Sequence, residues 1–149
     1  MRDIVTAIEI NASPERVWQV LTGFPSYAQW NPVVRQIQGE AIPGSRLRVR
    51  VRFLDGLNVS FRPTVIIAEG GRKLMWRGRV LFSWLFTGEH FFIIEPLGSG
   101  RVKFLQYEVY SGALVPVIIA VIGGRTRRVF EEMNKALKAR AESSLRDSV

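Results

Sequence analysis

The stretch that decides the fold is RLRVRVRF, residues 46–53. Apolar and basic residues alternate over all of its positions, with arginines on one face and Leu47, Val49, Val51 and Phe53 on the other. A period of two indicates a β-strand with one buried face and one solvent-facing face. The segment therefore predicts a strand in a sheet that is covered on one side only.

Further strands are predicted on both sides of this one. Alternating or turn-bounded apolar runs cover residues 3–11, 58–68, 73–81, 87–95 and 102–110. Only short turns separate the strands that follow residue 46, so we expect an antiparallel sheet of consecutive hairpins. About six strands should follow the first.

Helices are predicted at two places in the chain. Ser13-Pro14-Glu15 has the residues of a helix start, and the helix should continue to about Thr22, followed by a short helical turn over residues 25–30. From Val115 onward the pattern is that of one long helix. A curved sheet covered by a single helix leaves its interior partly unfilled. The sequence therefore predicts an α+β domain, residues 1–149, with a cavity between sheet and helix.

Composition limits the chemistry that this chain can perform. The 149 residues are 47% hydrophobic and 23% charged, which is typical of a globular domain. The absence of cysteine excludes disulfides, thiolate zinc sites and a cysteine nucleophile, and the single histidine, His90, excludes a multi-histidine metal site. We therefore expect no metal and no cofactor.

The start of the chain and its longest apolar run bear on localisation. Residues 3–11 alternate and lack the continuous apolar region of a secretory signal. The longest apolar run, residues 113–122, contains Pro116 and is too short to span a bilayer. We expect a cytoplasmic protein.

Three segments carry a resemblance to a known family. IEINASPERVW at residues 8–18, YAQWNP at 27–32 and GEHFF at 88–92, together with the order of elements, resemble the START/Bet v 1-like (SRPBCC) superfamily. The nearer match is its bacterial branch of polyketide cyclase/dehydrase and lipid-transport-like proteins. The resemblance implies a helix-grip fold: a seven-stranded antiparallel sheet wrapped around the long C-terminal helix, with two short helices after strand 1. It also implies a hydrophobic cavity, and it leaves carrier, sensor and cyclase roles open.

The strands over 87–95 and 102–110 place the lone histidine near a carboxylate. A hairpin centred on Ser99 pairs His90 with Glu108, and also pairs Phe92 with Gln106 and Ile94 with Phe104. Directly opposed Cβ atoms lie about 4.5–5.5 Å apart. The pair either orients a ligand and moves a proton at the cavity wall, or is structural and satisfies itself. Glu108 would raise the histidine pKa, whereas desolvation would lower it.

The remaining candidate ligand-binding residues are aromatic or lie on the long helix. Trp30 and Asn31 either line the cavity mouth or form a packing tryptophan and a turn asparagine. Phe53 and Trp76 are assigned inward, and the faces of Phe61 and Trp84 stay open. The full candidate set is Trp30, Asn31, Phe53, Phe61, Trp76, Trp84, His90, Phe92, Phe104, Gln106, Glu108, Ile118, Val129 and Met133.

Three functions follow from these observations. The first is binding of a hydrophobic or amphipathic small molecule, lipid-like or polyketide-like, in the cavity. The second is a cyclase or dehydratase of a polyketide-like substrate in which His90 and Glu108 handle protons. The sequence does not decide between monomer and homodimer.

The third function is electrostatic binding, because the net charge is +8. No aromatic residue interleaves Arg46, Arg48, Arg50 and Arg52, which argues against nucleic acid and for a solvated sheet face. Residues 113–122, followed by Arg125, Arg127 and Arg128, fit transient docking on an anionic membrane. The alternative, which the sequence favours over membrane docking, is a buried helix start that caps the cavity.

Overall fold

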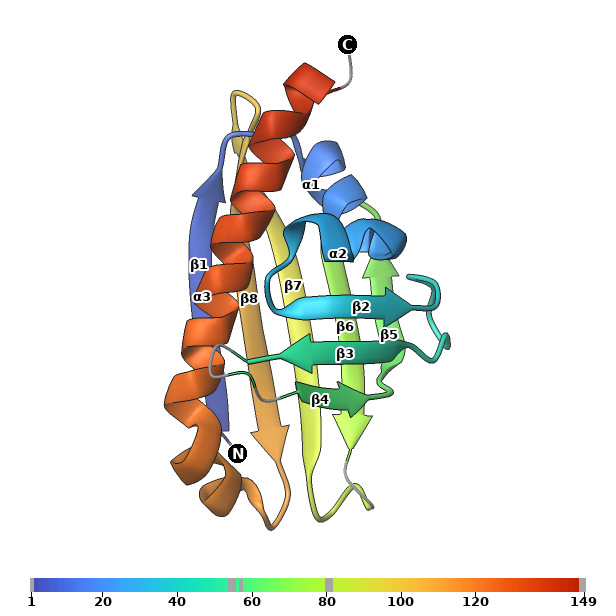
Figure 1. The fold of residues 1–149 in the computed structure, drawn as a ribbon, viewed down its shortest axis with the longest axis vertical. Coiled ribbons are helices and arrows are strands. Elements are labelled where there is room, and N and C mark those ends of the chain that lie inside the picture. The colour runs from blue at the N-terminus through green and yellow to red at the C-terminus, as the bar shows by residue number, and fades with distance from the viewer. Residues whose placement is uncertain (1, 54–55, 57, 80–81, 148–149) are drawn as a thin grey trace.

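The computed structural model describes residues 2–53, 56, 58–79 and 82–147, and Figure 1 shows their arrangement. The elements in chain order are β1 (Arg2–Ile10), α1 (Pro14–Thr22), the 3-10 helix η1 (Phe24–Ser26), α2 (Tyr27–Trp30), β2 (Val34–Gln38), β3 (Arg48–Arg52), β4 (Asn58–Phe61), β5 (Thr64–Glu69), β6 (Lys73–Arg79), β7 (Thr87–Gly98), β8 (Arg101–Ser111) and α3 (Val115–Asp147). The strands form two antiparallel sheets, one ordered β1-β8-β7-β6-β5 and one ordered β2-β3-β4.

The predicted helix starts are confirmed. The Ser13 hydroxyl accepts a hydrogen bond from the Arg16 backbone N–H at 3.1 Å, and Pro14 occupies the first helical position. A serine cap satisfies one of the backbone donors that a helix leaves unpaired. α1 then buries Val17, Val20 and Leu21 on one face, and α3 begins at Val115 as expected.

The deciding stretch forms β3, with Val49 and Val51 buried and Arg48, Arg50 and Arg52 exposed, as the alternation predicts. The single strand expected over 58–68 is instead two strands, β4 and β5, which belong to different sheets. Pro63 lies between them, and because proline has no backbone N–H it cannot continue a strand ladder.

Two further differences from the predicted strands concern β2 and β6. β2 has no predicted counterpart, and it pairs with β3 through an irregular register between Val34 and Gln36. The strand expected over 73–81 is observed as β6, residues 73–79, while residues 80 and 81 lie outside the described residues.

The elements enclose one apolar interior. In Figure 1 the three-stranded sheet lies crosswise in front of the long strands, and α3 runs along the same side of the five-stranded sheet. The buried side chains come from both sheets, α1 and α3, and include Leu21, Val49, Phe92, Phe104 and Leu137. This is the helix-grip α+β fold that the sequence predicts, but its described strands form sheets of five and three strands instead of the single seven-stranded sheet that the resemblance implies. No helix in the described part of the chain combines the length and the apolarity that a membrane span requires.

Candidate functional site

A cavity of about 250 Å³ lies between the two sheets and α3. Most of its lining is apolar, and the polar groups on its wall come from β6, β8, α3 and His90 of β7. The lining residues are Val33, Val34, Val49, Val51, Phe53, Val59, Phe61, Trp76, Gly78, Arg79, Phe86, His90, Glu108, Tyr110, Thr126, Val129, Phe130 and Met133. An apolar chamber with a few convergent polar groups is the usual form of a small-molecule site.

The predicted pairing of His90 with Glu108 is confirmed. β7 and β8 pair in the register that places His90 opposite Glu108 and Phe92 opposite Gln106. His90 Nδ1 lies 3.7 Å from Glu108 Oε2, and both side chains line the cavity. That separation exceeds hydrogen-bond distance, so a ligand atom or a small side-chain movement can complete the contact.

A chain of buried side chains fixes the orientation of the imidazole. His90 Nε2 lies 2.9 Å from Gln106 Oε1. Gln106 Nε2 donates to Asn134 Oδ1 at 2.8 Å, and Asn134 Nδ2 donates to Thr6 Oγ1 at 2.9 Å. Because Gln106 Oε1 can only accept, Nε2 of His90 carries the proton. The lone pair of a neutral His90 is therefore on Nδ1, which faces Glu108.

Burial keeps His90 neutral. Its ring stacks on Phe92 with centroids 4.3 Å apart and also lies against Phe130 and Trp76. Desolvation lowers the pKa of His90 to about 4 and outweighs the opposite effect of the hydrogen bond to Gln106. The sequence leaves open whether the pKa of His90 is raised by Glu108 or lowered by burial, and in the structure burial has the larger effect.

Burial also favours the neutral form of Glu108. Desolvation raises the pKa of Glu108 to about 7, although the Tyr110 hydroxyl donates to Oε2 at 3.1 Å and opposes the shift. Room for the carboxyl group comes from Gly88, because a Cβ at that position would lie 2.7 Å from Glu108 Oε1. Below about pH 7 the pair is therefore mainly an uncharged imidazole beside a carboxylic acid, rather than an ion pair.

Seven of the predicted ligand-binding residues line this cavity: Phe53, Phe61, Trp76, His90, Glu108, Val129 and Met133. They come from both sheets and from α3, as expected for a cavity closed by one long helix. Phe61, whose face the sequence does not assign, points inward opposite Val49 at the edge of the small sheet.

The structure places the seven other candidates away from the cavity wall. Phe92 and Phe104 are fully buried in the core, and Gln106 lies behind His90 as its hydrogen-bond partner. Ile118 is half-exposed on α3, and Trp84 is 66% exposed on the surface.

Trp30 and Asn31 have the structural roles that the sequence offers as their alternative. Trp30 packs on Tyr27 with ring centroids 4.8 Å apart. Asn31 is completely buried, and its Oδ1 accepts from the backbone N–H groups of Val33 and Val34. The asparagine therefore forms the turn that leads into β2.

Several lining residues were not among the predicted ones. Tyr110 shares the face of Glu108 two positions earlier, and Val49 and Val51 share the face of Phe53, so alternation alone was sufficient to find them. Val33 and Val34 lie at the start of β2, a strand that the sequence analysis does not predict.

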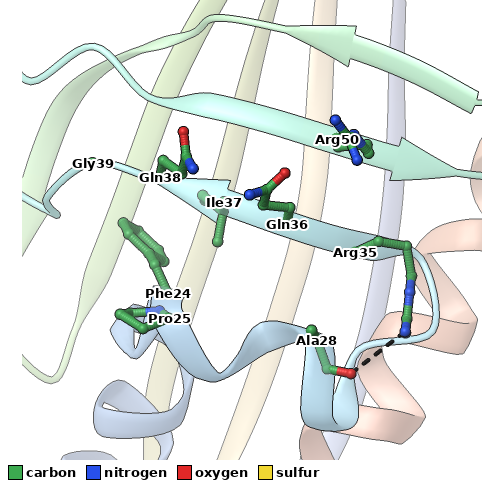
Figure 2. A pocket seen from close by; sticks show the side chains of 9 residues that line it. All are labelled: Phe24, Pro25, Ala28, Arg35, Gln36, Ile37, Gln38, Gly39 and Arg50. Atoms are coloured by element: carbon green, nitrogen blue, oxygen red, sulfur yellow. Dashed lines mark hydrogen bonds between the residues drawn. The ribbon is translucent and has the colours of Figure 1, made fainter.

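A larger hollow, of about 700 Å³, lies outside the molecule's interior, between β2 and the segment of η1 and α2 (Figure 2). Its wall combines polar side chains, among them Arg35, Gln36 and Arg50, with apolar ones such as Phe24 and Ile37. Arg35 donates to the carbonyl of Ala28. Neither His90 nor Glu108 reaches this hollow. The interior cavity is therefore the candidate site.

Comparison with known proteins identifies a family and a set of similar folds. The family model described as "Polyketide cyclase / dehydrase and lipid transport" matches residues 1–142. No curated protein sequence matches the chain.

Solved structures share the fold at low identity. The Zhui aromatase/cyclase from a Streptomyces species is 16% identical, with a TM-score of 0.78 over 97% of this chain and 95% of that one. A START superfamily protein from Mycobacterium smegmatis is 22% identical, with a TM-score of 0.71 over 94% and 97%. A norcoclaurine synthase from Thalictrum is 13% identical, with a TM-score of 0.70 over 94% and 93%.

Proposed function

The chain belongs to the polyketide cyclase/dehydrase and lipid transport family, and from that premise we propose that it binds a hydrophobic or amphipathic small molecule in the interior cavity. The observation that carries the proposal is a largely apolar chamber with His90, Glu108 and Tyr110 on one part of its wall. Burying an apolar ligand there removes its surface from water, while the polar groups choose its orientation.

The size of the cavity limits the ligand. Its volume of about 250 Å³ is just below the range of roughly 300–1,000 Å³ that is usual for drug-sized ligands. A molecule with one or two fused rings, or the end of a longer chain, fits this space. Val59 and Phe61, each more than a third exposed, mark the side on which a longer ligand would leave the cavity.

The polar pair favours a ligand with a hydroxyl or carbonyl group at one end. A protonated Glu108 donates a hydrogen bond, whereas Nδ1 of neutral His90 accepts one. A ligand hydroxyl placed between them can use both. A purely aliphatic ligand would leave both groups without a partner, and buried unpaired polar groups are costly.

Native mass spectrometry of protein purified from its own host tests the proposal. We expect wild type to carry a small apolar molecule that is lost in Val51→Phe, which fills the cavity. The matched control is Ile66→Phe, which adds bulk at an exposed position on β5 that is not on the cavity wall. Retention of the molecule by Val51→Phe, or a wild-type protein that carries none, would contradict the proposal.

A second candidate function is a dehydratase or cyclase, and the raised pKa of Glu108 favours it. A proton-transfer group works best when its pKa is near the working pH, and that of Glu108 is about 7. The carboxylate would remove a proton from carbon next to a ketone. The resulting acid would then protonate a departing hydroxyl group, so that one water is lost and Glu108 returns to its starting state.

The enzyme hypothesis is tested with a cyclic β-hydroxyketone as substrate. Its dehydration gives an enone whose ultraviolet absorbance is followed with time. Turnover should fall at least about a hundredfold in Glu108→Gln if this carboxyl transfers the proton. The control, Glu89→Gln, removes a carboxylate from the same sheet that instead pairs with Arg77. Equal rates in the two variants would exclude Glu108 from catalysis.

A further inference from the structure

Exposed apolar side chains gather where α3 begins. The apolar tip, as we name it, consists of Phe82, Trp84, Val117 and Val121. Their exposed fractions are 59%, 66%, 62% and 71%. The rings of Phe82 and Trp84 stack in parallel with centroids 5.8 Å apart. Val117 and Val121 are one helical turn apart and so share one side of α3. The alternative of a buried helix start therefore does not hold for these two valines.

The two halves of the apolar tip are held together by the backbone. Ala113 N–H donates to the carbonyl of Trp84 and Leu114 N–H donates to that of Leu85, both at 3.0 Å. Figure 1 shows the connection between β6 and β7 and the first turns of α3 at the same, lower end of the molecule. The exposed aromatic residues therefore lie on a connection that is fixed to the start of the helix.

Positive charge follows the apolar tip along α3. Arg125, Arg127 and Arg128 are exposed on the following turns of α3. No acidic residue occurs between Gly112 and Phe130, nor between Gly78 and Gly88. The two segments that build the tip therefore carry basic but no acidic side chains, in a protein whose net charge is +8.

The cavity wall extends to the same end of the fold. Phe86 lines the cavity two residues after Trp84, and Thr126 lines it next to Arg125 and Arg127. A surface held by the apolar tip would therefore lie close to the elements that enclose the cavity.

We propose that the apolar tip docks on an anionic phospholipid bilayer, with Phe82 and Trp84 at the interface and the α3 arginines over the headgroups. Aromatic and aliphatic side chains next to basic ones are the combination that binds such interfaces. The competing occupant is a second copy of the chain. A symmetric dimer through the tip would bring two arginine clusters together, so charge favours the lipid surface. This inference does not depend on what occupies the cavity.

Vesicle flotation tests the inference with the full chain. The probes are vesicles of phosphatidylcholine alone and of phosphatidylcholine with about one-third phosphatidylglycerol. The variants are Phe82→Ser with Trp84→Ser, Val117→Ser with Val121→Ser, and Arg125→Gln with Arg128→Gln. The matched control is Ile42→Ser with Leu97→Ser, which removes exposed apolar residues elsewhere on the surface; Leu97 lies near the end of β7, away from its start at Thr87.

We expect wild type and the Ile42/Leu97 control to bind the anionic vesicles with an affinity at least about tenfold higher than their affinity for the neutral ones. Each tip or arginine variant should lose about tenfold in binding to the anionic vesicles. Tryptophan emission should shift to shorter wavelength when wild type meets anionic vesicles, and this shift should be absent in the Phe82/Trp84 variant. Native mass spectrometry of the variants checks that cavity occupancy is unchanged, which separates this inference from the proposed function.

Three results would overturn the inference. Wild type could stay unbound at both lipid compositions, or the tip variants could bind as well as the control. A concentration-dependent dimer that the Phe82/Trp84 variant dissolves, without any vesicle binding, would assign the tip to a second copy of the chain instead.

Discussion

His90 has aromatic rings on several sides, and the imidazolium form would have to give up its hydration there. Glu108 lies 3.7 Å from Nδ1 but is itself largely withdrawn from water. Ionising both groups would require the desolvation of two charges. The attraction between the two charges is smaller than that desolvation free energy. The pair therefore favours the uncharged state, and below about pH 7 the proton is on the carboxyl group rather than the ring.

This assignment predicts opposite pH effects from the two residues. Burial raises the pKa of Glu108 from 4.5 to about 7, so the folded state holds this proton more tightly. Stability from Glu108 therefore falls as pH rises from 4.5 to about 7. Burial lowers the pKa of His90 from 6.5 to about 4, so stability falls as pH drops from 6.5 to about 4. Between pH 4.5 and 6.5 the two effects largely cancel.

Single substitutions should separate the two effects. In Glu108→Gln the unfolding free energy should rise with pH between about 4 and 6.5, and in His90→Gln it should fall between about 4.5 and 7. Each change amounts to at most about 3 kcal/mol, from the usual conversion of a pKa shift to free energy. Urea unfolding at a series of pH values measures both. A flat or oppositely sloped profile in either variant would contradict the pKa shift assigned to the residue that remains.

The hydrogen-bonded chain through Gln106 predicts one tautomer of His90. The ring should carry its proton on Nε2 at pH 7, because Gln106 Oε1 accepts there. Nitrogen-15 chemical shifts of the ring distinguish this tautomer from the Nδ1–H form and from the imidazolium. In Gln106→Leu the preference for the Nε2 proton should weaken. An imidazolium signal in wild type at pH 7 would contradict the neutral assignment.

At the scale of elements, the β7–β8 hairpin and the start of α3 determine where the site and the apolar tip lie. Gly112 ends β8's turn toward α3 with φ +114°, a left-handed conformation that favours glycine. A Cβ there would lie 2.5 Å from the carbonyl oxygen of Leu85, which is backbone and cannot rotate away. This close approach holds the residues before β7 against those before α3.

Gly112→Ala should therefore destabilise the fold by more than about 2 kcal/mol, because it combines backbone strain with a clash. Gly71→Ala is the matched control. Gly71 also has positive φ, at +75°, but a Cβ there meets no atom within 4 Å, so only the strain of roughly 1 kcal/mol remains. Urea unfolding of both variants measures the difference. Equal losses of stability would show that the contact with Leu85 does not constrain the turn.

At the scale of the whole molecule, the sequence predicts the site's central pair better than its surroundings. Strand alternation and a turn centred on Ser99 were enough to place His90 opposite Glu108, because pairing parity fixes which residues share a face. The same parity places Gln106 on that face but does not show its depth. Gln106 lies behind His90 because it contacts Phe130 and Asn134 of α3. Strand alternation contains no information about these contacts with the helix.

The division into two sheets depends on one proline within a segment that otherwise alternates like a single strand. Residues 58–68 alternate well enough to predict one strand, yet Pro63 separates β4 from β5. β2 is short and irregular. Its pairing with β3 is a tertiary feature that the local sequence pattern does not predict. Because Trp84 is aromatic, it is predicted to line the cavity. It lies in a surface connection instead, and its side chain is 66% exposed.

The claim that the interior cavity is a ligand site is tested most directly by methyl NMR spectra during a titration with 2-naphthol. This aromatic alcohol has two fused rings and one hydroxyl group, which suit the cavity's volume and its polar pair. If the ligand occupies the cavity, saturable shifts are expected at the methyl groups of Val51, Val129 and Met133. Shifts confined to Ile37, which lines the outer hollow, or no saturable shifts at all, would contradict the claim.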